Sequence, residues 1–311
     1  MAQDTPPPKL IESIRSAEDL AALVELFGAE SVHEAYFGAT EHWESYQLQR
    51  QEQDENGHTE GLPGTCVTVD GTDFHVHGVT HAGTDAEQQF LREHARAFLD
   101  RGAVIYCEQG IRSMYFDGFD SVCEMDDYLW AMRECEQLEG DSHVSALPES
   151  GLESVFDDLG SVTADFREAT FSLIESGGQV YGDRFERALG DVAADFLTSN
   201  SDLGVGKSYE AFTLHQEASE DPERLGALQR YYERVFLPQP LEREWLRRHD
   251  PELELVSHAR NERMADYAIY HNQEATEVHL IVGAAHQPGV VYYLQEYRDG
   301  DREVPEDFQS L

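Results

Sequence analysis

The pattern Gly-x-x-His occurs at two places that lie far apart in the chain. The first runs from Gly78 to His81, directly after FHVH, and the second runs from Gly283 to His286, directly after VHLIV. Both preceding runs are rich in β-branched and aromatic residues, which predicts strands. A glycine at a strand end allows a tight backbone turn, so that the histidine can project over the sheet edge. Ligands of open α/β sheets bind beyond the carboxyl ends of strands, and both histidines are therefore candidate site residues.

A carboxylate follows a third apolar run. The run AVIYCE ends at Glu108, with Arg112 four residues later, and predicts a buried parallel strand. A carboxylate in this position is costly unless it is paired or bound to a cation. Two histidines and one carboxylate are typical metal ligands, so we expect His81, Glu108 and His286 to bind Mn, Co or Zn. The alternative is that the histidines are structural and that Glu108 pairs with Arg112 or Arg263.

Two further histidines, His75 and His77, alternate on the strand that precedes the first motif. Alternate residues of a strand point the same way, and this His-x-His pattern resembles that of metal-dependent amidohydrolases. A barrel of that kind needs eight regular βα units, which the helical middle of this chain does not provide.

The surrounding elements predict an α/β fold with a mixed or mostly parallel central sheet flanked by helices. The polar, proline-rich residues 1–9 predict a disordered tail, and residues 10–311 predict a single domain. Residues 112–256 have the pattern of amphipathic helices, and we expect them to form a helical insertion or lid. Elsewhere, helices are predicted over 10–50, 84–102 and 257–272, and strands in TCVTVD, FHVHG, AVIYCE and EVHLIVG. The order strand, helix, strand that ends at Glu108 predicts a βαβ unit.

The charge of the chain is strongly acidic. Asp and Glu number 62 against 22 Lys and Arg, which gives a formal net charge of −40, and Lys9 and Lys207 are the two lysines. The acidic residues are scattered and aromatic residues are plentiful, which argues against disorder. At molar salt the Debye length falls to about 3 Å, so this composition suits the cytoplasm of a halophile. The same charge argues against nucleic-acid binding.

The ends and apolar runs of the sequence bear on where the protein works. The start, MAQDTPPPKL, lacks the basic and apolar regions of a signal peptide. No apolar run reaches the roughly 18 residues of a membrane helix. We therefore expect a cytoplasmic protein without a membrane span, whose partner is a peptide or a small-molecule substrate. A homodimer is compatible with the sequence.

Two blocks of the sequence resemble the TraB/PrgY/Tiki family. HGVTHAGTDAEQQFLREHARAFLDRGAVIYCEQGIR is similar to its first conserved block, and NERMADYAIYHNQEATEVHLIVGAAHQPGVVYYL to its last. The family pattern combines two Gly-x-x-His motifs, a strand-end Glu with an Arg four residues on, and a Glu-Arg pair that opens the last helix. Here the last two features are Glu108 with Arg112 and Glu262 with Arg263. The resemblance implies a haloarchaeal-type member with a fold shared with erythromycin-esterase-like and haem-uptake ChaN-like proteins.

The resemblance also implies a function. Tiki proteins are metal-dependent peptidases that use the paired histidines and the glutamate, so this chain is expected to be a metal-dependent hydrolase of peptide, amide or ester bonds. Glu108 would be a metal ligand or the base, Arg112 and Arg263 would bind developing negative charge, and Glu262 would orient a histidine. PrgY-type members are linked to peptide pheromone control, which leaves a non-catalytic peptide- or haem-binding regulator as the alternative. The chain lacks the membrane segments of many members, and its central region matches none.

Overall fold

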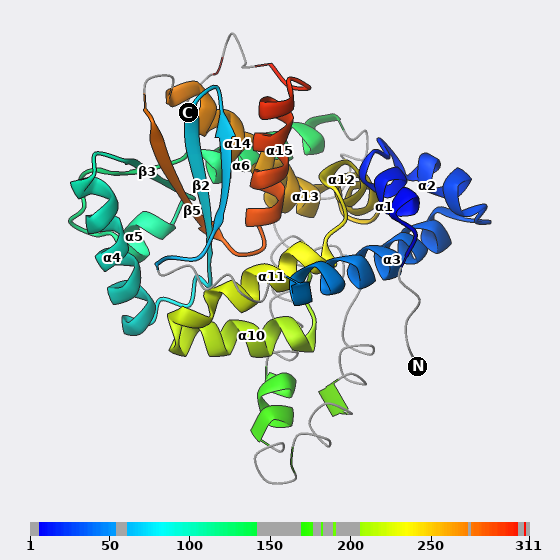
Figure 1. The fold of residues 1–311 in the computed structure, drawn as a ribbon, viewed down its shortest axis with the longest axis horizontal. Coiled ribbons are helices and arrows are strands. Elements are labelled where there is room, and N and C mark those ends of the chain that lie inside the picture. The colour runs from blue at the N-terminus through cyan, green and yellow to red at the C-terminus, as the bar shows by residue number, and fades with distance from the viewer. Residues whose placement is uncertain are drawn as a thin grey trace.

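The computed structural model describes residues 6–53, 61–141, 169–176, 182, 189–190, 206–272, 275–303 and 308. Within these ranges the chain forms the predicted α/β fold, in which helices flank one mixed sheet (Figure 1). The sheet is built from β1 (Thr65–Val69), β2 (Thr72–Val79), β3 (Val104–Cys107), β4 (Val122–Glu124) and β5 (Glu277–Gly283).

The last strand of the chain occupies the middle of the sheet, since the strand order is β1-β2-β5-β3-β4. β1 and β2 are antiparallel, and every other neighbouring pair is parallel. Asp70 and Gly71 join β1 to β2 and both have positive φ, 50° and 88°, as type I′ hairpin turns require. The predicted hairpin and βαβ unit are therefore confirmed, with β5 inserted between the two parallel strands of that unit.

Helices form most of the remaining described chain. They are α1 (Pro8–Arg15), α2 (Leu20–Phe27), α3 (Val32–Gln53), α4 (Asp85–Asp100), α5 (Ile111–Tyr115), α6 (Asp127–Asp141), α10 (Tyr209–Glu220), α11 (Leu225–Val235), α12 (Gln239–His249), α13 (Pro251–Glu254), α14 (Arg260–His271) and α15 (Gln287–Asp299). A 3-10 helix forms at Pro222–Arg224 and a π-helix at Leu255–Ala259. None of these helices is long and apolar enough to cross a membrane.

The helices form layers on the two faces of the sheet (Figure 1). On one face Ile281 of β5 packs with Leu91 and Phe98 of α4. On the other face Leu280 packs with Met264 of α14, and α15 joins the same core. Because consecutive β5 residues are buried on opposite faces, the strand is apolar along its whole length, as expected of a central parallel strand.

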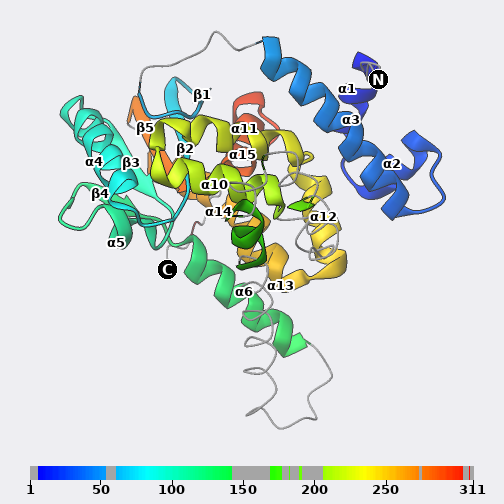
Figure 2. The same cartoon turned by 90° about the horizontal axis from the view of Figure 1, so that it is seen from below.

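The N-terminal helices α1, α2 and α3 form a separate core with α12, at the opposite end of the molecule from α4 and α5 (Figure 2). Tyr36 of α3 stacks on Trp245 of α12 with ring centroids 4.0 Å apart. The predicted tail is too long, because α1 begins at Pro8; proline is favoured in the first helical turn, where its missing N–H has no partner to lose. Residues 1–5 lie outside the described residues.

The described part of 112–256 is mostly helical and also contains one strand. Val122–Glu124 forms β4, which pairs in parallel with β3 and extends the sheet. The sheet therefore continues into the region that was predicted to be helical. Residues 142–168, 177–181, 183–188 and 191–205, which belong to the predicted insertion, lie outside the described residues.

The amidohydrolase interpretation of His75 and His77 is not supported by this architecture. The described strands form one five-stranded sheet rather than eight βα units. In addition, β1 and β2 are an antiparallel hairpin, which a barrel of regular βα units does not contain.

Candidate functional site

The strand order brings both Gly-x-x-His motifs and Glu108 to one edge of the sheet. β5 pairs in parallel with β2 on one side and with β3 on the other, so the carboxyl ends of all three strands meet. The register places Val79 opposite Gly283 and Cys107 opposite Ile281. The backbone N–H of Glu108 then donates to the Ile281 carbonyl at 3.0 Å, which anchors the carboxylate beside the second motif.

The three predicted ligand residues lie together. Nε2 of His81 is 3.3 Å from Oε2 of Glu108, and Nε2 of His286 is 3.5 Å from Oε1 of the same carboxylate. Glu108 is only 3% exposed, so it is almost fully removed from water. We call these three residues the His–Glu cluster.

The two motif glycines permit close approach, and neither adopts a left-handed conformation, since neither has a positive φ. A turn does follow Gly283, whose carbonyl accepts from the His286 N–H at 2.8 Å. A Cβ atom at Gly283 would lie 3.1 Å from Nε2 of His81 and 3.3 Å from Oε2 of Glu108. A Cβ atom at Gly78 would lie 2.8 Å from the Cα of Ala284. The left-handed conformation occurs at His81 instead, with φ 61°. Such strain in a non-glycine residue is concentrated at functional sites.

The segment before and after His81 is held by hydrogen bonds from three helices. The buried carboxylate of Glu87 on α4 accepts from the Thr80 N–H at 2.7 Å and from the Thr80 hydroxyl at 2.6 Å. It also accepts from the Tyr115 hydroxyl of α5, which in turn accepts from the Gly83 N–H at 2.9 Å. His215 of α10 bonds to the Thr80 carbonyl. These hydrogen bonds hold the backbone on both sides of His81 and so stabilise its left-handed conformation.

Arg260 is the cationic partner of Glu108. Its Nη2 donates to Oε1 of Glu108 at 2.6 Å, and its Nε donates to Asp127 at 2.9 Å. The other carboxylate oxygen accepts from the Gly283 N–H at 2.6 Å. The alternative, in which Glu108 pairs with Arg112 or Arg263, is therefore wrong in its partner, because Arg260, at the start of α14, is the arginine that binds Glu108.

Asn261 orients His286. Nδ1 of His286 lies 2.7 Å from the side-chain oxygen of Asn261, whose amide nitrogen donates to Gln239. An amide oxygen can only accept, so we assign the proton to Nδ1 and the lone pair to Nε2, which faces Glu108. This is the orienting contact that the sequence assigned to Glu262.

The surroundings shift the pKa of each of the three members of the cluster. Burial lowers the pKa of His286 to about 4, despite the opposing effect of Glu108. Burial would raise the pKa of Glu108, but His286, His81 and Arg260 together hold it well below its ordinary value. Burial lowers the pKa of His81, and the nearby Glu108 more than offsets this and raises it. Near neutral pH the cluster therefore contains a neutral His286 and an ionised carboxylate.

Two other predicted residues make contacts outside the cluster. Nε of Arg112 donates to the Val122 carbonyl at 2.9 Å, and Arg112 lines a separate hollow of about 380 Å³. Arg263 binds Asp126 through two hydrogen bonds, of 2.9 and 2.6 Å. The hydrogen bonds of both arginines therefore fix neighbouring segments of the chain.

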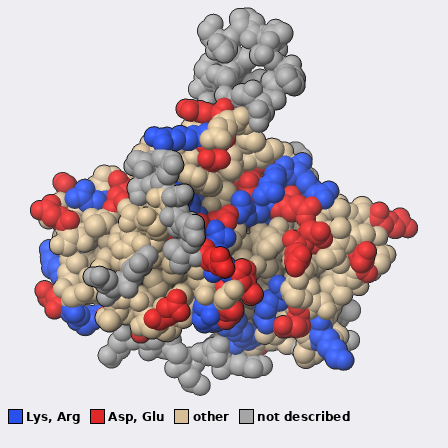
Figure 3. Space-filling model, turned by 90° about the horizontal axis from the view of Figure 1, so that it is seen from above, with Lys and Arg blue, Asp and Glu red and all other residues tan. Residues whose placement is uncertain are grey.

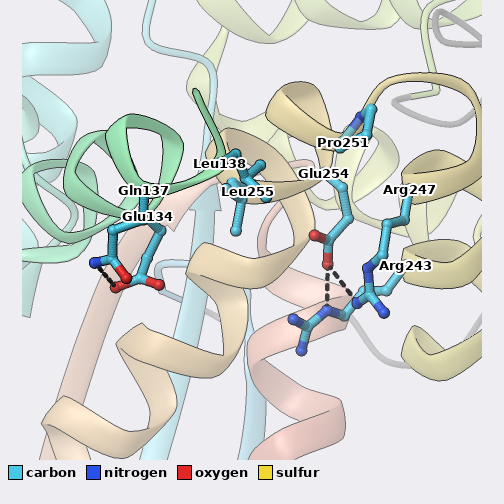
Figure 4. A pocket seen from close by; sticks show the side chains of 8 residues that line it. All are labelled: Glu134, Gln137, Leu138, Arg243, Arg247, Pro251, Glu254 and Leu255. Carbon is cyan, nitrogen blue, oxygen red and sulfur yellow. Dashed lines mark hydrogen bonds and ion pairs between the residues drawn. The ribbon is translucent and has the colours of Figure 1, made fainter. Parts of the chain in front are cut away.

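Glu262 also points elsewhere, because successive residues of a helix project in different directions. Its carboxylate pairs with Arg243 and with Arg302, the latter at 2.8 Å. Arg243 borders a further hollow of about 360 Å³, where it and Arg247 turn toward Glu254 (Figure 4). Glu262 therefore belongs to an ion-pair network between α12, α14 and the end of the chain.

His75 and His77 lie in a stack of rings with His279 of β5. His77 is hydrogen-bonded through Nε2 to Nδ1 of His279 and through Nδ1 to the Pro63 carbonyl, both at 2.9 Å. His279 in turn stacks on Phe98 of α4 at 3.6 Å. Both ring nitrogens of His77 are thus occupied, which leaves it without a free lone pair for a metal.

The donors of the His–Glu cluster fit a divalent cation in chemical type. Nε2 of His286 presents a lone pair, and Nε2 of His81 is buried without a hydrogen-bond partner in the described structure. No group of three or more His, Cys, Asp or Glu side chains among the described residues is arranged to hold a metal ion as it stands. Arg260 and the Gly283 N–H already bind the carboxylate.

No family model, no curated protein and no solved structure matches this chain. The likeness of its two sequence blocks to the TraB/PrgY/Tiki pattern therefore stays a prediction.

Proposed function

We propose that this protein is a metal-dependent hydrolase of peptide-like amide or ester bonds, of the TraB/PrgY/Tiki type. The observation that carries the proposal is the convergence of His81, Glu108 and His286, with two imidazole nitrogens directed at one buried carboxylate. These residues come from three strand ends that the sequence separates by up to 205 positions, 286 minus 81.

In this proposal His81, Glu108 and His286 hold a Mn, Co or Zn ion. Such an ion polarises a substrate carbonyl and makes its bound water a nucleophile near neutral pH. Asn261 keeps the proton of His286 on Nδ1, so that Nε2 is available as a ligand. Arg260, rather than Arg112 or Arg263, pairs with Glu108 and keeps it ionised.

We further propose that the protein works in the cytoplasm of a halophile, on account of its net charge of −40, and acts on a peptide or small molecule. The competing function is a regulator that binds a peptide or haem without turnover. The two differ in whether substrate is consumed, and a haem-binding protein would also show a Soret band when purified.

The test is hydrolysis of a panel of chromogenic amides and esters in molar KCl, with Mn, Co or Zn added. The variant Glu108→Gln should lose at least about 100-fold in rate, and a chelator should abolish the activity. The control Arg112→Gln should retain it, since Arg112 bonds to the Val122 carbonyl outside the cluster. An equal rate in Glu108→Gln, or no turnover with any of the three metals, would contradict the proposal.

A further inference from the structure

Arg260 links the His–Glu cluster to a second buried carboxylate, that of Asp127 at the start of α6. Asp127 is fully buried and Arg260 is 7% exposed, so both charges depend on protein groups rather than on water for their hydrogen bonds. One guanidinium thus serves two carboxylates, those of Glu108 and Asp127, and these three groups together keep an excess of negative charge.

The guanidinium of Arg260 is held mainly by partners other than Glu108. Its Nε donates to Oδ2 of Asp127 at 2.9 Å, its Nη2 also donates to that oxygen, and its Nη1 donates to the Val256 carbonyl at 3.2 Å. Val256 lies in the π-helix that precedes α14, and π-turns of this kind are frequent at functional sites. A single hydrogen bond, from Nη2, reaches Glu108. Arg260 can therefore release Glu108 and keep its other hydrogen bonds.

Asp127 is itself fixed by the segment that carries Glu108. Its Oδ1 accepts from the backbone N–H of Gln109, the residue after Glu108, at 3.0 Å. The ring of Tyr128 lies beside the guanidinium, with its centroid 5.4 Å from Cζ of Arg260. Asp127 is thus a rigidly placed second acceptor for Arg260, directly beside the first.

Arg260 and a divalent cation compete for the same carboxylate. Arg260 donates to Oε1 of Glu108, and this is the oxygen that faces Nε2 of His286. A guanidinium that remains on Glu108 repels a cation there, whereas one that is carried by Asp127 leaves the carboxylate oxygen available.

We propose that Asp127 is a positioning residue, which holds Arg260 when a divalent cation binds Glu108 and thereby sets the affinity of the His–Glu cluster for that cation. The inference rests on the proposed function, because it takes the cluster as a cation site. It adds to that function a residue outside the cluster that controls how readily the site is filled.

The residue before Asp127 provides a matched control. Asp126 is also buried, and it binds Arg263 through two hydrogen bonds, of 2.9 and 2.6 Å. The variant Asp126→Asn therefore removes the same charge from the adjacent position and leaves the pairing of Arg260 with Asp127 in place.

The test measures Co binding rather than turnover. Co is titrated into metal-free wild type, Asp127→Asn and Asp126→Asn in molar KCl, in competition with a chromophoric chelator, and circular dichroism checks that each protein is folded. Asp127→Asn should weaken Co binding at least about tenfold, because a neutral amide leaves the charge of Arg260 on Glu108. Asp126→Asn should bind Co as wild type does.

The double variant Asp127→Asn/Arg260→Gln distinguishes positioning from a merely structural role. It removes both charges, so that neither is left buried without its partner. Without the competing guanidinium, the affinity for Co should return to within about threefold of wild type. This comparison with wild type decides the question even where Asp127→Asn alone does not fold.

The outcomes separate this inference from the hydrolase itself. Equal Co affinity in wild type and Asp127→Asn, or a loss in the double variant as large as in Asp127→Asn, overturns the role of Asp127; turnover in the same preparations would leave the hydrolase standing. A loss that is confined to Asp127→Asn and is restored in the double variant supports the inference even where no substrate is hydrolysed. Wild type that binds no Co contradicts both the cation site and this inference.

Discussion

At the scale of the residue, hydrogen bonds decide which histidines are able to act as ligands. His77 is buried and His286 is mostly buried, with 14% of its side chain exposed. Burial lowers the pKa of His286 to about 4 and that of His77 to about 3. In His286 a single contact, with Asn261, leaves Nε2 free and directed toward Glu108. In His77 both nitrogens are bound. The same neutral side chain is thus a candidate ligand in one place and a structural link in the other.

The buried pair His77 and His279 predicts how stability depends on pH. Burial lowers their pKa values from 6.5 to about 3 and about 4, so the unfolded chain binds more protons than the folded one below pH 6.5. The free energy of unfolding should therefore fall as pH is lowered from about 6.5 to about 4. In His77→Gln/His279→Gln this pH dependence should be flatter, as measured by thermal unfolding between pH 7 and 4.5. Equal slopes in the two proteins would contradict the assignment.

The residues that the sequence did not reveal are Arg260 and Asn261. They directly precede Glu262 and Arg263, which were chosen because they match the family pattern. Glu262 and Arg263 instead form ion pairs on other sides of α14. Which residues of a helix face a site depends on how the helix is rotated against the sheet, and the sequence pattern alone does not set that rotation.

At the scale of the element, the site results from the position of β5. The two Gly-x-x-His motifs meet because β5 crosses to the middle of the sheet and pairs with β2. The strands and their ends were predictable from alternation and apolar runs, as with FHVHG and EVHLIVG. Their order was not, since pairing between distant strands leaves no trace in local sequence. The short strand β4, three residues long, was missed because it is too short to show a period.

The two motif glycines predict different effects of the same substitution. In Gly283→Ala the new methyl group would lie 3.1–3.4 Å from the side chains of the His–Glu cluster, which can shift slightly. We expect hydrolysis to be largely lost while the unfolding temperature changes little. In Gly78→Ala it would lie 2.8 Å from the backbone of Ala284, and we expect a clear loss of stability.

Activity assays and thermal unfolding of both variants, with wild type alongside, test this difference. If Gly283→Ala kept full activity, the cluster would not be the reacting centre. If Gly78→Ala unfolded at the wild-type temperature, Gly78 of β2 would not lie as close to Ala284, the residue after β5, as the structure places it.

At the scale of the whole molecule, the acidic excess is expected to affect stability, with a formal net charge of −40. On the face drawn in Figure 3, acidic and basic side chains lie close together in several places, among areas of other residues. Arg302 forms such pairs, with Glu262 at 2.8 Å and with Asp266 at 2.7 Å. Ion pairs of this kind do not cancel the excess of negative charge, since the chain has 62 acidic residues and only 22 basic ones. We expect salt to screen the rest of the negative charge.

Stability should therefore rise with ionic strength. The Debye length falls from about 10 Å at 0.1 M salt to about 3 Å at 1 M, which weakens repulsion among the carboxylates. We expect the unfolding temperature to increase steadily between 0.1 and 2 M KCl, as measured by circular dichroism. A temperature that is independent of KCl over this range would contradict the halophilic interpretation.

The central claim is that His81, Glu108 and His286 hold a divalent ion, and the most direct test is elemental analysis of the purified protein. Wild type, His81→Ala/His286→Ala and the control His75→Ala are each loaded with Mn, Co or Zn and dialysed in molar KCl. We expect about one ion per chain in wild type and in the control His75→Ala, and none in the double variant. No ion in wild type after loading, or the same content in the double variant, would contradict it.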